Sequence, residues 1–156
     1  MDWKKGRGKL GAFKPLIGSW RAAGDGPMGD FECVRTFREA LGGKYVELRA
    51  DWRFGDALKP GAAPGYEDLT LFGPRDETGL GFWSFTSDGK RSEGWLSSAE
   101  DIHEKALCFE ADMPAGRARQ VYYPDPEGLG LRWLVQRQVK KGWSEIAAHL
   151  YQSINE

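Results

Sequence analysis

Hydrophobic and polar residues alternate along most of the chain. The clearest run covers residues 46–54, where one charged side chain separates each apolar residue from the next in the series Val46, Leu48, Ala50, Trp52 and Phe54. Side chains on a β-strand point to opposite faces in turn, so this period predicts a half-buried strand. Similar runs predict about ten strands, near residues 17–24, 31–38, 44–54, 66–72, 80–86, 91–97, 105–111, 117–123, 129–139 and 144–154.

Short turn sequences separate these runs. Asp88-Gly89 lies between two apolar runs and is typical of a two-residue hairpin connection, since glycine adopts positive φ at little cost. Gaps this short leave no room for a crossover helix, so consecutive strands are expected to pair antiparallel. An open sheet of about ten strands would have two unpaired edges, which closure removes. The sequence therefore predicts an all-β fold, a single up-and-down antiparallel β-barrel of about ten strands.

The last segment fits two patterns. Ile146, Leu150 and Ile154 recur at four-residue steps, as on a helix, but together with Ala148 they also share one face of a strand. Periodicity alone does not separate these readings. A closed barrel requires a final strand that meets the first, so we interpret residues 144–154 as a strand.

Composition indicates one folded domain. The chain has 156 residues, 40% of them hydrophobic, with 21 glycines but only 8 prolines. A chain of this length builds one sizeable core. We expect residues 1–14 to form an N-terminal arm, whose basic residues Lys4, Lys5, Arg7 and Lys9 are solvated, and residues 15–156 to form the barrel.

Charge and targeting signals narrow the choice of partner and location. Lys and Arg number 22 and Asp and Glu number 23, for a net charge of −1, and the two signs are interleaved. This balance lacks the basic footprint of a nucleic-acid-binding protein. The chain also begins without the apolar stretch of a secretory signal and contains no run long enough for a membrane span. We therefore expect a cytoplasmic protein that binds no nucleic acid and has no membrane span.

Two cysteines, Cys33 and Cys108, lie far apart within apolar runs. They form no CxxC or Cys/His pattern, so we interpret them as reduced core thiols rather than as a disulfide or a metal site.

The first predicted strand carries a recognisable motif. Residues 16–20 read LIGSW, and Gly18-Ser19-Trp20 at the entry of an antiparallel barrel resembles the first-strand signature of lipocalins and the wider calycin group. This resemblance implies that the Trp20 indole plugs the closed end of the barrel. The segment 24–30 is too short for the helical lid of fatty-acid-binding proteins, so the chain resembles the lidless ten-stranded barrels.

Two lidless families share further features with the chain. A bacterial family of lipocalin-like barrels of unknown function is similar at residues 41–47, 65–72 and 81–89. Nitrobindins, which are haem-binding barrels, are similar at residues 16–21 and at His149-Leu150. The second resemblance implies haem as a cofactor, with His149 as the iron ligand and reactive nitrogen species as substrates. Without haem, no cofactor or metal is expected.

A barrel of about ten strands either fills its interior with side chains or holds a ligand there. Candidates for the lining of a cavity are the aromatic residues, one histidine and one arginine that lie in the predicted strands: Trp20, Trp52, Tyr66, Trp83, Trp95, Trp133, Arg137, His149 and Tyr151. Arg137 shares a strand face with Leu131, Trp133 and Val135, and is the preferred anchor for an acidic group. Aromatic residues also fill ordinary cores, and a lone histidine is often structural, so both readings stay open.

The sequence contains no set of catalytic residues. It has no nucleophile elbow, no HExxH and no phosphate-binding glycine loop between a strand and a helix. This favours a binding protein over an enzyme. The leading hypothesis is a barrel that binds a small hydrophobic or amphipathic molecule. The alternatives are a nitrobindin-like haem protein and a filled barrel that acts as an interaction or homodimerisation module.

Overall fold

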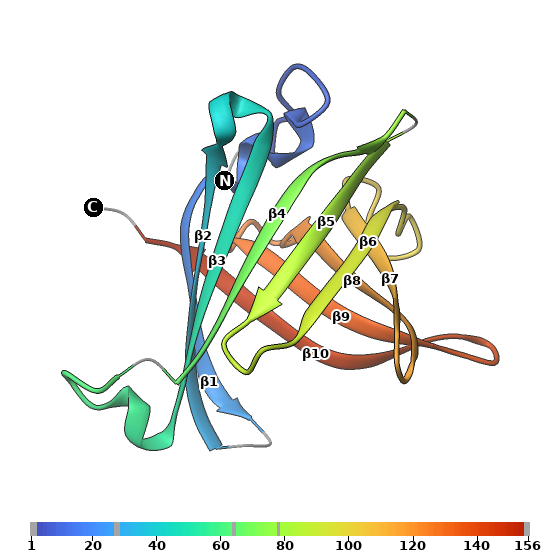
Figure 1. Cartoon of the computed structure of the whole chain (residues 1–156). Coiled ribbons are helices and arrows are strands. Elements are labelled where there is room, and N and C mark those ends of the chain that lie inside the picture. Colours follow the sequence, from blue (N-terminus) through green and yellow to red (C-terminus); the bar gives the residue numbers. More distant parts are fainter. Residues whose placement is uncertain (1–2, 27–28, 64, 78, 155–156) are drawn as a thin grey trace.

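Ten antiparallel strands close into one barrel in the computed structural model, which describes residues 3–26, 29–63, 65–77 and 79–154 (Figure 1). Each strand pairs with its neighbours in sequence, and β1 pairs with β10. The strands are β1 (Gly18–Gly26), β2 (Gly29–Ala40), β3 (Tyr45–Phe54), β4 (Tyr66–Asp76), β5 (Gly79–Thr86), β6 (Arg91–Ser97), β7 (Leu107–Met113), β8 (Gly116–Pro124), β9 (Leu131–Val139) and β10 (Gly142–Ser153). Three short 3₁₀ helices connect or precede them: η1 (Gly11–Leu16), η2 (Leu41–Gly43) and η3 (Gly55–Leu58).

The predicted fold class is confirmed. Every predicted strand has a counterpart in the barrel, and the ambiguous last segment is a strand. It carries an irregularity in its pairing with β9 between Glu145 and Ala147. The barrel closes where Trp20 lies opposite Ser153 and Arg21 lies opposite Gln152.

Glycine is required at two positions in the barrel wall, one in a tight turn and one where two strands approach closely. In the Asp88-Gly89 hairpin, Gly89 has a φ of +87°, in the left-handed region that favours glycine. Gly94 in β6 lies so close to β7 that an added Cβ would be 2.0 Å from the carbonyl oxygen of Glu110 and 2.5 Å from the Phe82 ring. A side chain at Gly94 would therefore displace both the neighbouring strand and a core aromatic.

The N-terminal segment closes one end of the barrel (Figure 1). Phe13 of η1 is 1% exposed, and its ring lies 4.8 Å from that of Phe72 and 6.1 Å from that of Phe109. Trp20 is also buried and donates a hydrogen bond from Nε1 to the Leu16 carbonyl oxygen at 2.8 Å. The basic side chains of the expected arm are exposed, but its apolar residues act as a plug.

A second, smaller cluster lies outside the barrel wall, under the connection between β6 and β7. It contains Ala99, Cys108, Val121 and Leu134. Cys108 is free and buried in this cluster, and Cys33 is free and buried in the barrel interior. Along the described ranges, no helix is long and apolar enough to cross a membrane.

Candidate functional site

A cavity of about 700 Å³ lies inside the barrel, near the end opposite the plug. The connection between β3 and β4, which Figure 1 places at that end, contributes Ala57 and Gly65 to its lining. Trp52, Phe54, Tyr66 and Trp133 provide aromatic walls, and the polar side chains that line it include Arg35, Asp68, Thr70, Ser84 and Gln120. The cavity therefore combines aromatic walls with a few polar groups, as small-molecule sites commonly do.

Arg35 is the cation of this cavity. It points inward from the middle of β2, opposite Ala50 of β3, and is only 3% exposed. Its Nε donates to the Tyr151 hydroxyl at 3.0 Å, and its Nη1 donates to the Tyr122 hydroxyl at 3.1 Å. The guanidinium carbon also lies 4.2 Å from the ring centroid of Trp133. Hydrogen bonds and aromatic faces thus hold the guanidinium in one orientation.

No carboxylate pairs directly with Arg35 among the residues that the structure describes. The partners of its described hydrogen bonds are two tyrosines, and burial raises the pKa of Tyr122 to about 12 and also raises that of Tyr151. Both hydroxyls are therefore neutral at physiological pH. Since an arginine stays protonated in proteins, the interior holds a positive charge without an ion-pair partner in contact with it.

Asp68 of β4 is the acidic group that lines the same cavity. Burial raises the pKa of its carboxyl group, although the positive charge of Arg35 and a hydrogen bond from Trp52 act in the opposite direction. Asp68 and Arg35 form no ion pair within 4.0 Å. Asp68 is thus an electrostatic neighbour of Arg35 rather than its direct partner.

His149 of β10 faces the interior but packs among aromatic rings. Its ring centroid lies 4.6 Å from that of Phe31, 5.5 Å from that of Trp133 and 5.9 Å from that of Trp52. Burial, followed by the charge of Arg35, lowers the pKa of His149. The lining of the 700 Å³ cavity does not include it. The imidazole therefore lies beside the cavity among aromatic rings, and not within the cavity lining.

The structure brings together part of the candidate set. Trp52, Tyr66 and Trp133 line the cavity, while Trp20, His149 and Tyr151 face the interior without being part of its lining. The ligand-binding role of these residues remains a prediction.

Trp83, Trp95 and Arg137 lie elsewhere. Trp83 packs against Tyr45, and Trp95 lies beneath Arg75 and Arg117, whose guanidinium carbons are 5.7 and 5.0 Å from its ring. These contacts are on the outer face of the barrel. Arg137 lies in the inward row of β9, as expected. It is nevertheless exposed, because it lies near the tip of the hairpin between β9 and β10, which extends beyond the neighbouring strands (Figure 1). These three residues therefore do not line the cavity.

Sequence reasoning missed the two charged groups of the cavity, Arg35 and Asp68. A signal for Arg35 is present in residues 31–37, where Phe31, Cys33, Arg35 and Phe37 occupy alternate positions. An arginine in the apolar row of an alternating strand points toward the barrel interior, and it is buried where that row lies away from a hairpin tip. Asp68 follows the same rule, because it shares a face with Thr70 and Phe72.

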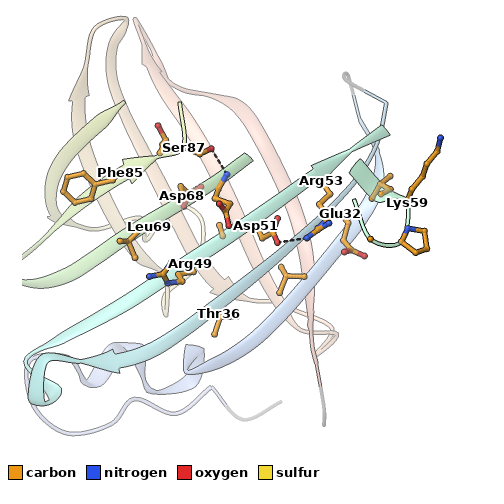
Figure 2. Close-up of a pocket in the computed structure, with 17 residues that line it drawn as sticks. Glu32, Thr36, Arg49, Asp51, Arg53, Lys59, Asp68, Leu69, Phe85 and Ser87 are labelled. Atoms are coloured by element: carbon orange, nitrogen blue, oxygen red, sulfur yellow. Dashed lines mark hydrogen bonds and ion pairs between the residues drawn. The ribbon is translucent and has the colours of Figure 1, made fainter. Parts of the chain in front are cut away.

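A second hollow, of about 780 Å³, lies on the outer face of β2, β3 and β4 (Figure 2). Figure 2 shows Glu32, Arg49, Asp51, Arg53 and Lys59 around it, and Arg53 donates to Asp51 at 3.3 Å. Acidic and basic side chains are mixed here, so their charges favour no class of ligand. Across the described part of the chain, no group of three or more His, Cys, Asp or Glu residues could hold a metal ion.

Comparisons with known proteins support the fold alone. No protein-family model and no curated protein matches the sequence. The crystal structure of Rv2717c from M. tuberculosis is similar over 96% of this chain and 99% of its own, with a TM-score of 0.58 and 16% identity. A de novo designed fluorescence-activating β-barrel is similar over 70% of this chain and 93% of its own, with a TM-score of 0.43 and 18% identity. The chain is thus a closed ten-stranded antiparallel barrel with solved structural neighbours.

Proposed function

We propose that this protein binds a small, partly apolar molecule inside the barrel. The observation that carries the proposal is the 700 Å³ cavity, which is lined by Trp52, Phe54, Tyr66 and Trp133. Side chains fill the opposite end of the barrel, so the space is confined to one end. Flat aromatic walls favour a flat or apolar ligand, and the polar groups between them orient it.

Two other functions have less support. Haem binding through His149 has less support because the imidazole lies outside the lining of the 700 Å³ cavity. A barrel that is filled and acts only through its outer surface would not require a cavity of this size near Arg35.

A neutral fluorescent probe tests the proposal. 2-Anthracenemethanol accepts excitation energy from tryptophan, so binding beside Trp52 and Trp133 should produce saturable energy transfer. Ser84 lines the cavity and is half-buried, and Ser84→Phe should fill part of the space and weaken probe binding about tenfold or more. The matched control is Ser98→Phe, the same change at an exposed position after β6.

Circular dichroism and the melting temperature establish that both variants are folded. Equal probe affinity in the folded Ser84→Phe variant and the unmodified protein would place the probe outside the cavity. That result, or the absence of saturable binding to the unmodified protein, would contradict the proposed function.

A further inference from the structure

The charge inside the barrel indicates the chemical class of the ligand. Arg35 is buried and lines the cavity, and its described hydrogen bonds use two of the five N–H donors of a guanidinium. Both acceptors are tyrosine hydroxyls rather than carboxylates. A ligand in the cavity therefore meets a fixed cation that has donors left to offer.

Burial of an unpaired charge is unfavourable, and an anion that reaches the charge relieves that cost. Aromatic rings shield the Arg35 guanidinium from water and fix its orientation. The ring centroids of Trp133 and Trp52 lie 4.2 Å and 5.5 Å from the guanidinium carbon. A preorganised guanidinium favours a planar carboxylate, which accepts two parallel hydrogen bonds.

The number of cations limits the charge of the ligand. Arg35 is the one cationic side chain among the described residues that line the cavity, and Asp68 lies on the same wall. A phosphate monoester carries up to two negative charges near neutral pH, so it would leave charge uncompensated in this space. A singly charged acid matches the site better.

We propose that the cavity binds a monocarboxylate with a flat apolar body, whose carboxylate group pairs with Arg35 while its body lies against Trp52 and Trp133. This inference rests on the proposed function and adds the charge of the ligand to it. Asp68 opposes binding of the anion whenever its own carboxyl group is ionised, because both negative groups then face Arg35.

A competition experiment separates the two proposals. Bound 2-anthracenemethanol is displaced by 2-naphthoate, 2-naphthalenemethanol or 2-naphthyl phosphate at pH 7, in a buffer of constant ionic strength. We expect naphthoate to bind about tenfold or more tightly than the alcohol, the ratio typical of one charge-assisted hydrogen bond. Arg35→Met should abolish this preference, so that the affinities of the acid and the alcohol lie within about threefold of each other.

The matched control is Arg119→Met, which removes an arginine that is equally buried but lies on the outer face. It should keep the preference for naphthoate. Equal binding of the acid and the alcohol, or a preference that survives Arg35→Met, would overturn the inference while leaving the proposed function intact. Stronger binding of naphthyl phosphate than of naphthoate would overturn the single-charge assignment. Absence of binding by the neutral probe contradicts the proposed function itself.

If Arg35→Met does not fold, Asp68→Asn decides the question. Removal of the competing carboxyl group should increase the ratio of naphthoate affinity to alcohol affinity severalfold. An unchanged or lower ratio would overturn the inference.

Discussion

Among the residues that the structure describes, two arginines are almost completely buried, and their surroundings differ. Arg119 of β8 is 4% exposed on the outer face, where its guanidinium donates two hydrogen bonds to Asp101, at 2.7 and 3.2 Å, and one to Gln136 at 2.7 Å. Trp143 lies 4.4 Å from its guanidinium carbon. Arg35 is 3% exposed on the inner face, and its hydrogen bonds go to two neutral hydroxyls.

The two arginines differ in how their charge is paired. The contacts of Arg119 join β8, β9 and the connection between β6 and β7, so its charge is used within the fold. The charge of Arg35 has no such partner and borders a cavity. Similar burial thus accompanies two different surroundings, and the partner of the charge, rather than the burial, distinguishes them.

The largest expected effect is on stability at Arg119. Arg119→Met should lower the free energy of unfolding by about 3 kcal/mol, because it removes hydrogen bonds of a buried cation and leaves Gln136 without its donor. Urea unfolding followed by tryptophan fluorescence measures this change. Arg38→Met, at an exposed ion pair, is the matched control and should stay within about 0.5 kcal/mol. If Arg119→Met lowers the free energy of unfolding no more than Arg38→Met does, Arg119 does not stabilise the fold as proposed.

A smaller effect is expected at the inner arginine. Arg35→Met should change the free energy of unfolding by about 1 kcal/mol or less, since the loss of two hydrogen bonds is offset by the removal of a buried charge without a direct carboxylate partner. The same urea titration provides the comparison. If Arg35→Met lowers the free energy of unfolding as much as Arg119→Met does, Arg35 stabilises the fold as Arg119 does, and the two sites do not differ in this respect.

The smallest effect concerns the two carboxyl groups near these arginines, whose pKa values shift in opposite directions. Burial raises the pKa of Asp68 above 3.8, so above that pH the folded protein keeps a proton that the unfolded chain has released, and stability falls as pH rises. The Arg119 hydrogen bond lowers the pKa of Asp101, so its contribution is complete above 3.8 and is lost as pH falls through the lowered pKa.

Melting temperatures at several pH values test these signs. Relative to the unmodified protein, Asp68→Asn should become more stable as pH rises above 3.8. Asp101→Asn should become less stable as pH rises toward 3.8, and its difference from the unmodified protein should then stay constant. The two variants serve as controls for each other. Parallel changes would show that the two carboxyl groups do not differ in their surroundings.

The strands of the barrel were predictable because alternation is a local signal. Residues 46–54 carry it without interruption, and the Asp88-Gly89 turn marks a hairpin that the structure contains. The inward face of each strand was harder to assign. Trp83 and Trp95 are apolar but lie outside, where Tyr45, Arg75 and Arg117 cover them.

The candidate site was only partly predictable for the same reason. Arginines usually face solvent, and alternation alone does not show which arginine of an inward row is buried. Arg137 was the preferred anchor and Arg35 was missed, although both lie in inward rows. The depth of a residue along the barrel depends on how far each hairpin extends, which the sequence of one strand does not encode. In β10, Ala147 faces the core, so the isoleucine that precedes it faces outward and is 60% exposed.

The barrel closes where β1 meets β10, and this pairing is shorter than that of β1 with β2. Within the described residues, β1 and β10 are joined at two paired positions, Trp20 with Ser153 and Arg21 with Gln152, and by one further bond from the Ile154 amide to the Ser19 carbonyl oxygen. Adjacent β1 and β2 are paired along the full length of β1. Hydrogen exchange should therefore begin along this line, and the cylinder is best regarded as a rolled sheet fastened near one corner.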